Sequence, residues 1–138
     1  MPIRDAILAD AAAIARIHVD SWRTTYRGLM PDDLLAGLSY ERREHQWTHD
    51  IAASGEGRGC VVVADVADAG IVGFASGGRC RRDWPYAGEL FAIYLAAAHQ
   101  GRGLGRALLL AVADRLAAQG HESMLLWVLD TNALGRGF

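Results

Sequence analysis

The sequence predicts a mixed α/β fold, in which helices cover a central sheet with both antiparallel and parallel strand pairs. Two observations support this prediction. Two β-branched runs separated by Asp68-Ala69-Gly70 have the pattern of an antiparallel hairpin. Further along, between Gly88 and Leu129, a strand, a long helix and a second strand follow one another. Such a crossover requires the two strands to be parallel.

The first half of the chain is predicted to be mainly helical. The alternating segment Pro2–Ile7 should form a short strand, and Asp10 is the expected N-cap of the helix that follows. Pro31 precedes two acidic residues and marks the expected start of a second helix. A third helix, rich in charged residues, should run over Tyr40–Ala53 before a glycine-rich turn.

The second half is predicted to alternate strands with one long helix. The hairpin occupies Cys60–Gly78, and a further strand is expected at Gly88–Ala96. The long helix, Gly103–Gln119, has apolar residues at helical spacing and should end at Gly120. Its apolar stripe consists of Leu104, Leu108, Ala111 or Val112, and Leu116. A buried strand at Ser123–Leu129 completes the order β-α-α-β-β-β-α-β, before the chain opens a last helix.

Length and composition limit the class of protein. The 138 residues predict a single domain, residues 1–138, and the formal net charge of −2 argues against nucleic acid or an anionic membrane as the main partner. All fourteen basic residues are arginine, so no lysine is available for a Schiff base. No long apolar run or signal peptide is present, and neither the histidines nor the cysteines have metal-ligand spacing. We therefore expect a cytoplasmic protein with no membrane partner and no metal.

Three glycines at alternate positions, Gly101, Gly103 and Gly105, directly precede the long helix. A helix N-terminus presents unpaired N–H groups and the positive end of its dipole, which attract phosphate. Glycines allow a bulky anion to approach those groups because no Cβ intervenes. Arg102 and Arg106 add positive charge. The loop therefore predicts a pyrophosphate site, with a plain strand-to-helix turn as the alternative.

Other phosphate-binding motifs fit the loop poorly. A Walker A loop needs a Lys-Ser/Thr pair, and none follows these glycines. A dinucleotide fingerprint needs glycine at its sixth position, where counting from Gly101 gives Arg106. Glu122 also precedes the next strand, whereas the ribose-binding acid of such enzymes follows it. A nicotinamide or flavin enzyme is thus the weaker interpretation.

The glycine loop and its flanking segments resemble the GNAT superfamily of N-acyltransferases. Gln100–Leu109 (QGRGLGRALL) is similar to the acyl-CoA loop of that family, Q/R-x-x-G-x-G/A. Gly88–His99 resembles its fourth strand, and Leu126–Phe138 resembles its fifth strand and the start of the next helix. The N-terminal segment is similar to its opening strand and helices. The resemblance implies a GNAT-like three-layer fold with a splayed parallel strand pair, and acetyl-CoA as the cosubstrate.

The resemblance also implies how acetyl-CoA is held. The pyrophosphate would lie on the N–H groups of the glycine loop, and the pantetheine arm would pair with the backbone of the fourth strand. An N–H near Leu95 or Ala96 would polarise the thioester carbonyl. The implied cofactor-binding residues are Ile93, Tyr94, Leu95, Gln100, Gly101, Arg102, Gly103, Leu104, Gly105, Arg106 and Asn132.

Transfer of an acyl group to an amine requires a base, because an amine is mostly protonated near neutral pH. Glu89 begins the expected fourth strand and matches a position at which some family members carry a base carboxylate, so we predict it to be catalytic. A solvent-facing or arginine-paired glutamate is the alternative. The resemblance places Trp22 and Tyr26 over the acceptor pocket, with Trp84 in the loop before the strand. Core packing is the alternative for these three predicted substrate residues.

The predicted function is therefore transfer of acetyl from acetyl-CoA to a primary amine, small molecule or peptide N-terminus, by direct attack. A non-catalytic acyl-CoA-binding or interaction module is the alternative. The chain ends at Phe138, one residue before the tyrosine that commonly serves as the acid in the family. We therefore expect a C-terminally incomplete domain; pairing of the fifth strand with a second copy, in a homodimer, is the alternative.

Overall fold

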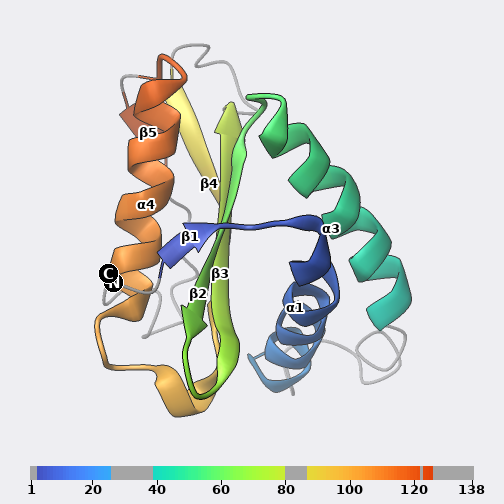
Figure 1. Cartoon of the computed structure of the whole chain (residues 1–138). Coiled ribbons are helices and arrows are strands. Elements are labelled where there is room, and N and C mark those ends of the chain that lie inside the picture. Colours follow the sequence, from blue (N-terminus) through green and yellow to red (C-terminus); the bar gives the residue numbers. More distant parts are fainter. Residues whose placement is uncertain (1–2, 26–38, 80–86, 122, 126–138) are drawn as a thin grey trace.

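The structure is a computed structural model that describes residues 3–25, 39–79, 87–121 and 123–125. These residues form a sheet of five strands between two helical layers, which confirms the predicted mixed α/β fold (Figure 1). The strands are β1 (Ile3–Asp5), β2 (Cys60–Val66), β3 (Gly70–Arg79), β4 (Ala87–Leu95) and β5 (Ser123–Leu125). The helices are α1 (Ala11–Thr25), α3 (Tyr40–Gly55) and α4 (Leu104–Ala118), with short 3-10 turns at Leu8–Asp10 and Ala97–His99.

The strands lie side by side in chain order. Each of the pairs β1–β2, β2–β3 and β3–β4 is antiparallel, whereas β4 and β5 are parallel. The predicted hairpin and the predicted crossover through α4 are both confirmed. Segments 26–38 and 126–138, where the second helix and most of the last strand were expected, lie outside the described residues.

One face of the sheet is covered by α4. Its predicted apolar stripe is buried, and the stripe packs on the residues of β2, β3 and β4 that point to this face. The helix approaches closely because Gly77 and Gly88 lie beneath it. A Cβ at Gly77 would come within 2.7 Å of Val112 Cγ1, and one at Gly88 within 2.6 Å of Leu116 Cδ1. This contact fixes α4, and hence the loop before it, against β3 and β4.

The other face of the sheet is covered by α1 and α3 (Figure 1). Ser39 caps α3 by accepting a hydrogen bond from the Arg42 N–H at 3.2 Å, and the helix begins at Tyr40 as predicted. Trp47 and Ile51 are buried one helical turn apart and pack on Val61, Val63 and Phe74 of the sheet. The two helices therefore form a second apolar core, separate from that under α4.

A β-bulge interrupts the pairing of β3 with β4. Ser76 is paired with Ala92 but Gly77 with Leu90, so Phe91 is an extra residue on β4. Its side chain is 40% exposed, and its ring lies 3.0 Å from where a Cβ on Gly78 would be. Gly78 is in turn the register partner of Glu89. The bulge therefore places the Phe91 ring next to the start of β4.

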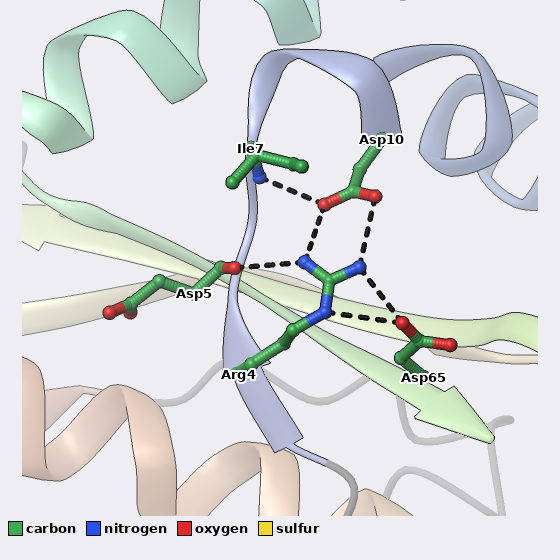
Figure 2. A network of polar contacts seen from close by, with 5 residues as sticks. All are labelled: Arg4, Asp5, Ile7, Asp10 and Asp65. Carbon is green, nitrogen blue, oxygen red and sulfur yellow. Dashed lines mark hydrogen bonds and ion pairs between the residues drawn. The ribbon is translucent and has the colours of Figure 1, made fainter. Parts of the chain in front are cut away.

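Asp10 does not cap α1 as predicted. It ends a 3-10 turn, where its carboxylate accepts the Ile7 N–H at 2.8 Å and two bonds from the Arg4 guanidinium at 2.8 and 3.1 Å (Figure 2). Arg4 also bonds Asp65 of β2 through Nε at 3.2 Å and Nη2 at 3.0 Å. The N-cap prediction for Asp10 is wrong because Arg4, on β1, competes for its carboxylate. The network ties β1, the turn before α1 and β2 together.

Cys60, the first residue of β2, is a free and buried thiol. Burial raises its pKa to about 11, which keeps the thiol protonated and unreactive at neutral pH. Cys80 lies outside the described residues. In the part of the chain that is described, no helix is long and apolar enough to cross a membrane.

We expect replacement of Asp10 by Asn to lower the free energy of unfolding by about 1–3 kcal/mol at neutral pH, because it removes a charge-assisted pair from a half-exposed arginine. The hydrogen bonds from Arg4 hold the pKa of Asp10 below its usual range. The carboxylate therefore stabilises the fold above the pKa of an unfolded Asp, and that stability is lost as pH falls through the lowered value.

Urea denaturation of both proteins at neutral pH and in acid measures this difference. The gap between wild type and Asp10→Asn should be largest at neutral pH and should narrow in acid. Asp114→Asn, on the exposed face of α4, is the matched control and should leave stability unchanged. A gap that does not depend on pH would show that the charge of Asp10 is not the stabilising feature.

Candidate functional site

The glycine loop before α4 has the geometry of an anion site. Gly101 and Gly103 have φ angles of +79° and +81°, and a Cβ at either would meet nothing within 4 Å. Gly103 is the N-cap of α4 but has no side chain to bond the first N–H groups of the helix. The backbone donors at Leu104, Gly105 and Arg106 therefore face open space at the positive end of the helix dipole.

Arg102 and Arg106 flank this loop and are exposed. Within the described residues, neither guanidinium forms a hydrogen bond or an ion pair. Leu104 and Gly105 are buried, so they contribute backbone rather than side chain to the surface. The loop therefore fits a pyrophosphate such as that of coenzyme A, with two unpaired cations beside it.

Gln100 joins the loop to β4. Its side-chain Nε2 donates a hydrogen bond to the Leu95 carbonyl at 3.1 Å. Leu95 is the last residue of the strand, and a 3-10 turn over Ala97–His99 separates it from Gln100. The predicted cofactor-binding residues Gln100 and Leu95 are therefore brought together, and the glycine loop is held against the end of β4.

The N–H of Leu95 points away from β3. Donors alternate between the two edges of an antiparallel strand, and the next N–H, that of Ala96, bonds the Val72 carbonyl at 2.8 Å. Of the two N–H groups that we expected near the thioester, Ala96 is therefore already engaged. Within the described residues, β5 pairs with β4 only over Ala87–Glu89. The described part of β5 therefore does not reach the edge of β4 at Ile93 and Leu95.

The side chains of Ile93 and Tyr94 lie on opposite faces of the sheet. Ile93 packs on the core beneath α4, whereas Tyr94 packs on the core beneath α1 and α3. The Trp22 indole Nε1 donates a hydrogen bond to the Tyr94 hydroxyl at 2.6 Å. A predicted substrate residue on α1 and a predicted cofactor residue on β4 therefore touch directly.

His18 lies at the centre of the aromatic cluster around this bond. Its ring centroid is 5.2 Å from that of Tyr94, 5.7 Å from Trp47 and 6.0 Å from Phe74. Its Nδ1 accepts a hydrogen bond from Trp47 Nε1 at 3.1 Å. Burial, and to a smaller extent the charge of Arg43, lowers the pKa of His18 to about 4. His18 is therefore a neutral packing group.

The predicted base, Glu89, is buried, with 3% of its surface exposed. Its backbone pairs with Gly78 on one side and with Leu125 of β5 on the other. It therefore does not face solvent, which was one of the two alternatives considered for it. The remaining predicted residues, Tyr26, Trp84 and Asn132, lie outside the described residues.

A cavity of about 530 Å³ lies beside the start of β4, and no pattern in the sequence indicates it. Its walls come from the end of α3, the start of β2, the end of β3, the bulge in β4 and the residues after α4. Two hydrogen bonds close the wall between α4 and β2. Gln119 Nε2 donates to the Gly59 carbonyl at 2.8 Å, and the Gly59 N–H donates to Gln119 Oε1 at 3.2 Å.

Comparison with known proteins adds a family to this geometry. The model of the acetyltransferase (GNAT) family matches residues 13–138. An uncharacterized N-acetyltransferase of Bacillus subtilis is 43% identical over 131 residues, which are 94% of this chain and 72% of the relative. Mycothiol acetyltransferase of Mycobacteroides abscessus is 34% identical over 136 residues, which are 91% of this chain and 45% of the relative.

Solved structures share the fold. The PaiA N-acetyltransferase of Thermoplasma acidophilum, in complex with coenzyme A, superposes with a TM-score of 0.83 at 22% identity, covering 99% of this chain and 84% of that one. A structure from Salmonella typhimurium with its cofactor acetyl-CoA gives a TM-score of 0.75 at 28% identity, covering 98% and 73%. The likeness extends over nearly the whole chain in both cases.

We expect the imidazole of His18 to titrate near pH 4 rather than near 6.5, because burial disfavours its charged form. The unfolded chain binds this proton more readily, so His18 should lower the free energy of unfolding as pH falls from about 6.5 towards 4. NMR titration of the histidine ring resonances measures the midpoint. His121, outside the cluster, is the internal comparison. A midpoint for His18 at or above 6.5 would contradict the buried, neutral ring.

Proposed function

The chain belongs to the GNAT family of acetyltransferases, and on that premise we propose that it transfers an acetyl group from acetyl-CoA to the amine of an acceptor. The observation that supports this proposal best is the open glycine loop at the N-terminus of α4, joined through Gln100 to the end of β4. An anion site next to a strand edge that none of the described residues covers suits a ligand with a pyrophosphate at one end and an amide-containing arm at the other.

The loop binds the donor through backbone and charge. The N–H groups at the start of α4 receive phosphate oxygens, and Arg102 and Arg106 neutralise the negative charge from the exposed side. Gly101 and Gly103 keep the approach clear because their left-handed conformation and lack of a Cβ leave the backbone bare. The backbone of Ile93 and Leu95 supplies donors and acceptors for the arm along the uncovered edge.

Acetyl-CoA supplies an activated thioester whose carbonyl carbon is attacked by the neutral amine, and the carbon–sulfur bond breaks as the new carbon–nitrogen bond forms. Negative charge grows on the carbonyl oxygen during this attack. The Leu95 N–H faces the open edge, since the neighbouring Ala96 N–H is bonded to Val72. The Ile93 N–H lies on the same edge and nearer to Glu89. Ile93 is thus the donor that we assign to that oxygen, and the Leu95 N–H serves the arm. The thiolate that leaves takes up one proton, and the amine gives one up.

Glu89 is the base that we assign to the amine proton. It lies on the same strand as Leu95, six residues nearer to the start, and it is buried beside the cavity wall formed by Gly78 and Phe91. A carboxylate shielded from water is suited to accept a proton from an ammonium, directly or through one water molecule. The acceptor would then enter from the end of β4 opposite to the glycine loop.

We expect Gly103→Val to weaken acetyl-CoA binding at least tenfold, because a branched side chain at a φ of +81° would distort the loop and occupy the phosphate approach. Isothermal titration calorimetry with acetyl-CoA, coenzyme A and NAD measures the effect and the selectivity. Gly120→Val is the matched control: Gly120 has a φ of +94° with open space around it, at the other end of α4. Equal affinity in both variants, or binding of NAD in place of coenzyme A, would refute this donor site.

We expect Glu89→Gln to lower kcat by about 10²-fold or more while the affinity for acetyl-CoA stays within about twofold, because the change removes the base and keeps the shape of the side chain. Release of free thiol, measured from acid to alkaline pH with a panel of amines, gives the rate. The acid limb of the profile should disappear in the variant. Glu44→Gln, on the exposed face of α3, is the control. A variant with the rate and pH profile of the wild type would remove Glu89 from the base role.

A further inference from the structure

The cavity beside Glu89 lies at the opposite end of the sheet from the glycine loop. β4 runs from the cavity to the loop, and α4 runs back from the loop to the cavity (Figure 1). Its volume of about 530 Å³ is in the range of pockets for small molecules. An acceptor in it would approach the donor from the far end of β4. The following inference rests on the proposed acetyl transfer.

Two unpaired charges of opposite sign line this cavity. Asp50 lies in the last turns of α3, and Arg79 is the last residue of β3. Within the described part of the chain, no hydrogen bond or ion pair reaches either side chain. The third charged residue, Arg58, is already paired with Glu56. Asp50 is half-buried, and loss of solvent raises its pKa by more than the charge of the adjacent His49 lowers it. An opposite charge beside Asp50 would therefore be favourable.

The two charges lie on different sides of the cavity. Asp50 belongs to α3, the helix layer that packs on the same face of the sheet as the Phe91 ring. Arg79 is the register partner of Gly88, whose missing Cβ would face Leu116 of α4. Arg79 is exposed at the mouth, whereas Ser76 is buried in the wall. The cavity is therefore acidic toward α3 and basic at its exposed rim.

We propose that this cavity binds the acceptor, and that the acceptor is a small amino acid or a close derivative with a free carboxylate. The carboxylate would pair with Arg79, and the ammonium would lie toward Asp50, near Glu89. Arg79 is thus a specificity-determining residue, since a guanidinium fork matches a carboxylate in geometry as well as in charge. The exposed Phe91 ring offers an apolar surface to the acceptor side chain.

The same charges disfavour two other classes of acceptor. A polyamine would bring a second cation against Arg79, which has no acidic partner among the described residues. An amine whose only charged group is its ammonium would leave Arg79 unpaired in the bound state. Both classes should therefore react less efficiently than the amino acid.

Matched pairs of acceptors test the proposal. L-phenylalanine, L-leucine and L-methionine are each compared with their carboxamides in the thiol-release assay. The carboxamide has nearly the same shape and no negative charge, and its amine loses a proton more easily. A preference for the free acid therefore cannot arise from the amine. We expect kcat/KM for at least one free acid to exceed that of its carboxamide by tenfold or more in the wild type.

The variant Arg79→Gln should reduce this preference about tenfold, mainly by raising KM for the free acid. Arg42→Gln, on the exposed face of α3, is the matched arginine control and should retain the preference. Equal efficiency for acids and carboxamides, a preference that survives Arg79→Gln, or coenzyme A binding without acetylation of any acid would each overturn the inference. Loss of coenzyme A binding itself would instead refute the proposed function, and calorimetry separates the two.

Discussion

Beyond Glu89, the described residues pair β4 on one side only, and the proposed site depends on this constraint. β4 bonds β3 along its length, but in the described residues it meets β5 only at its first three residues. Beyond Glu89 every second backbone donor, including that of Leu95, faces the uncovered edge. The glycine loop opens beside that edge because Gln100 holds it there. The residues proposed for donor binding, for carbonyl polarisation and as the base thus lie along one strand.

The elements that carry a local pattern of apolar and turn residues were predictable from the sequence. The buried stripe of α4 and the hairpin follow from periodicity and turn residues, which are local signals. The role of Asp10 was not predicted correctly, because Arg4 and Asp65 compete for contacts that a cap rule does not consider. The bulge at Phe91 was missed for another reason. The run LFAIYL is apolar throughout, so no break in alternation marks the extra residue.

The candidate site likewise has one part that the sequence predicts and another that depends on contacts between distant residues. The glycine loop was visible because its residues are consecutive and glycine at a positive φ has few substitutes. The contact of Trp22 with Tyr94 joins residues 72 positions apart, and the cavity is assembled from the ends of five segments. No spacing of residues in the sequence predicts contacts between segments so far apart. The sequence therefore predicts the proposed donor side, whereas the proposed acceptor side needed the packing of α1 and α3 on the sheet.

The two hydrogen bonds between Gln119 and Gly59 have a consequence for how two substrates would meet. They anchor the far end of α4 to β2, while the near end of the same helix carries the glycine loop. A helix of 15 residues is about 22 Å long and nearly incompressible along its axis. α4 thus acts as a spacer of fixed length between the phosphate site and the cavity. Adding or removing one residue inside it would shift one end relative to the other, so its length is constrained by the reach of the donor arm.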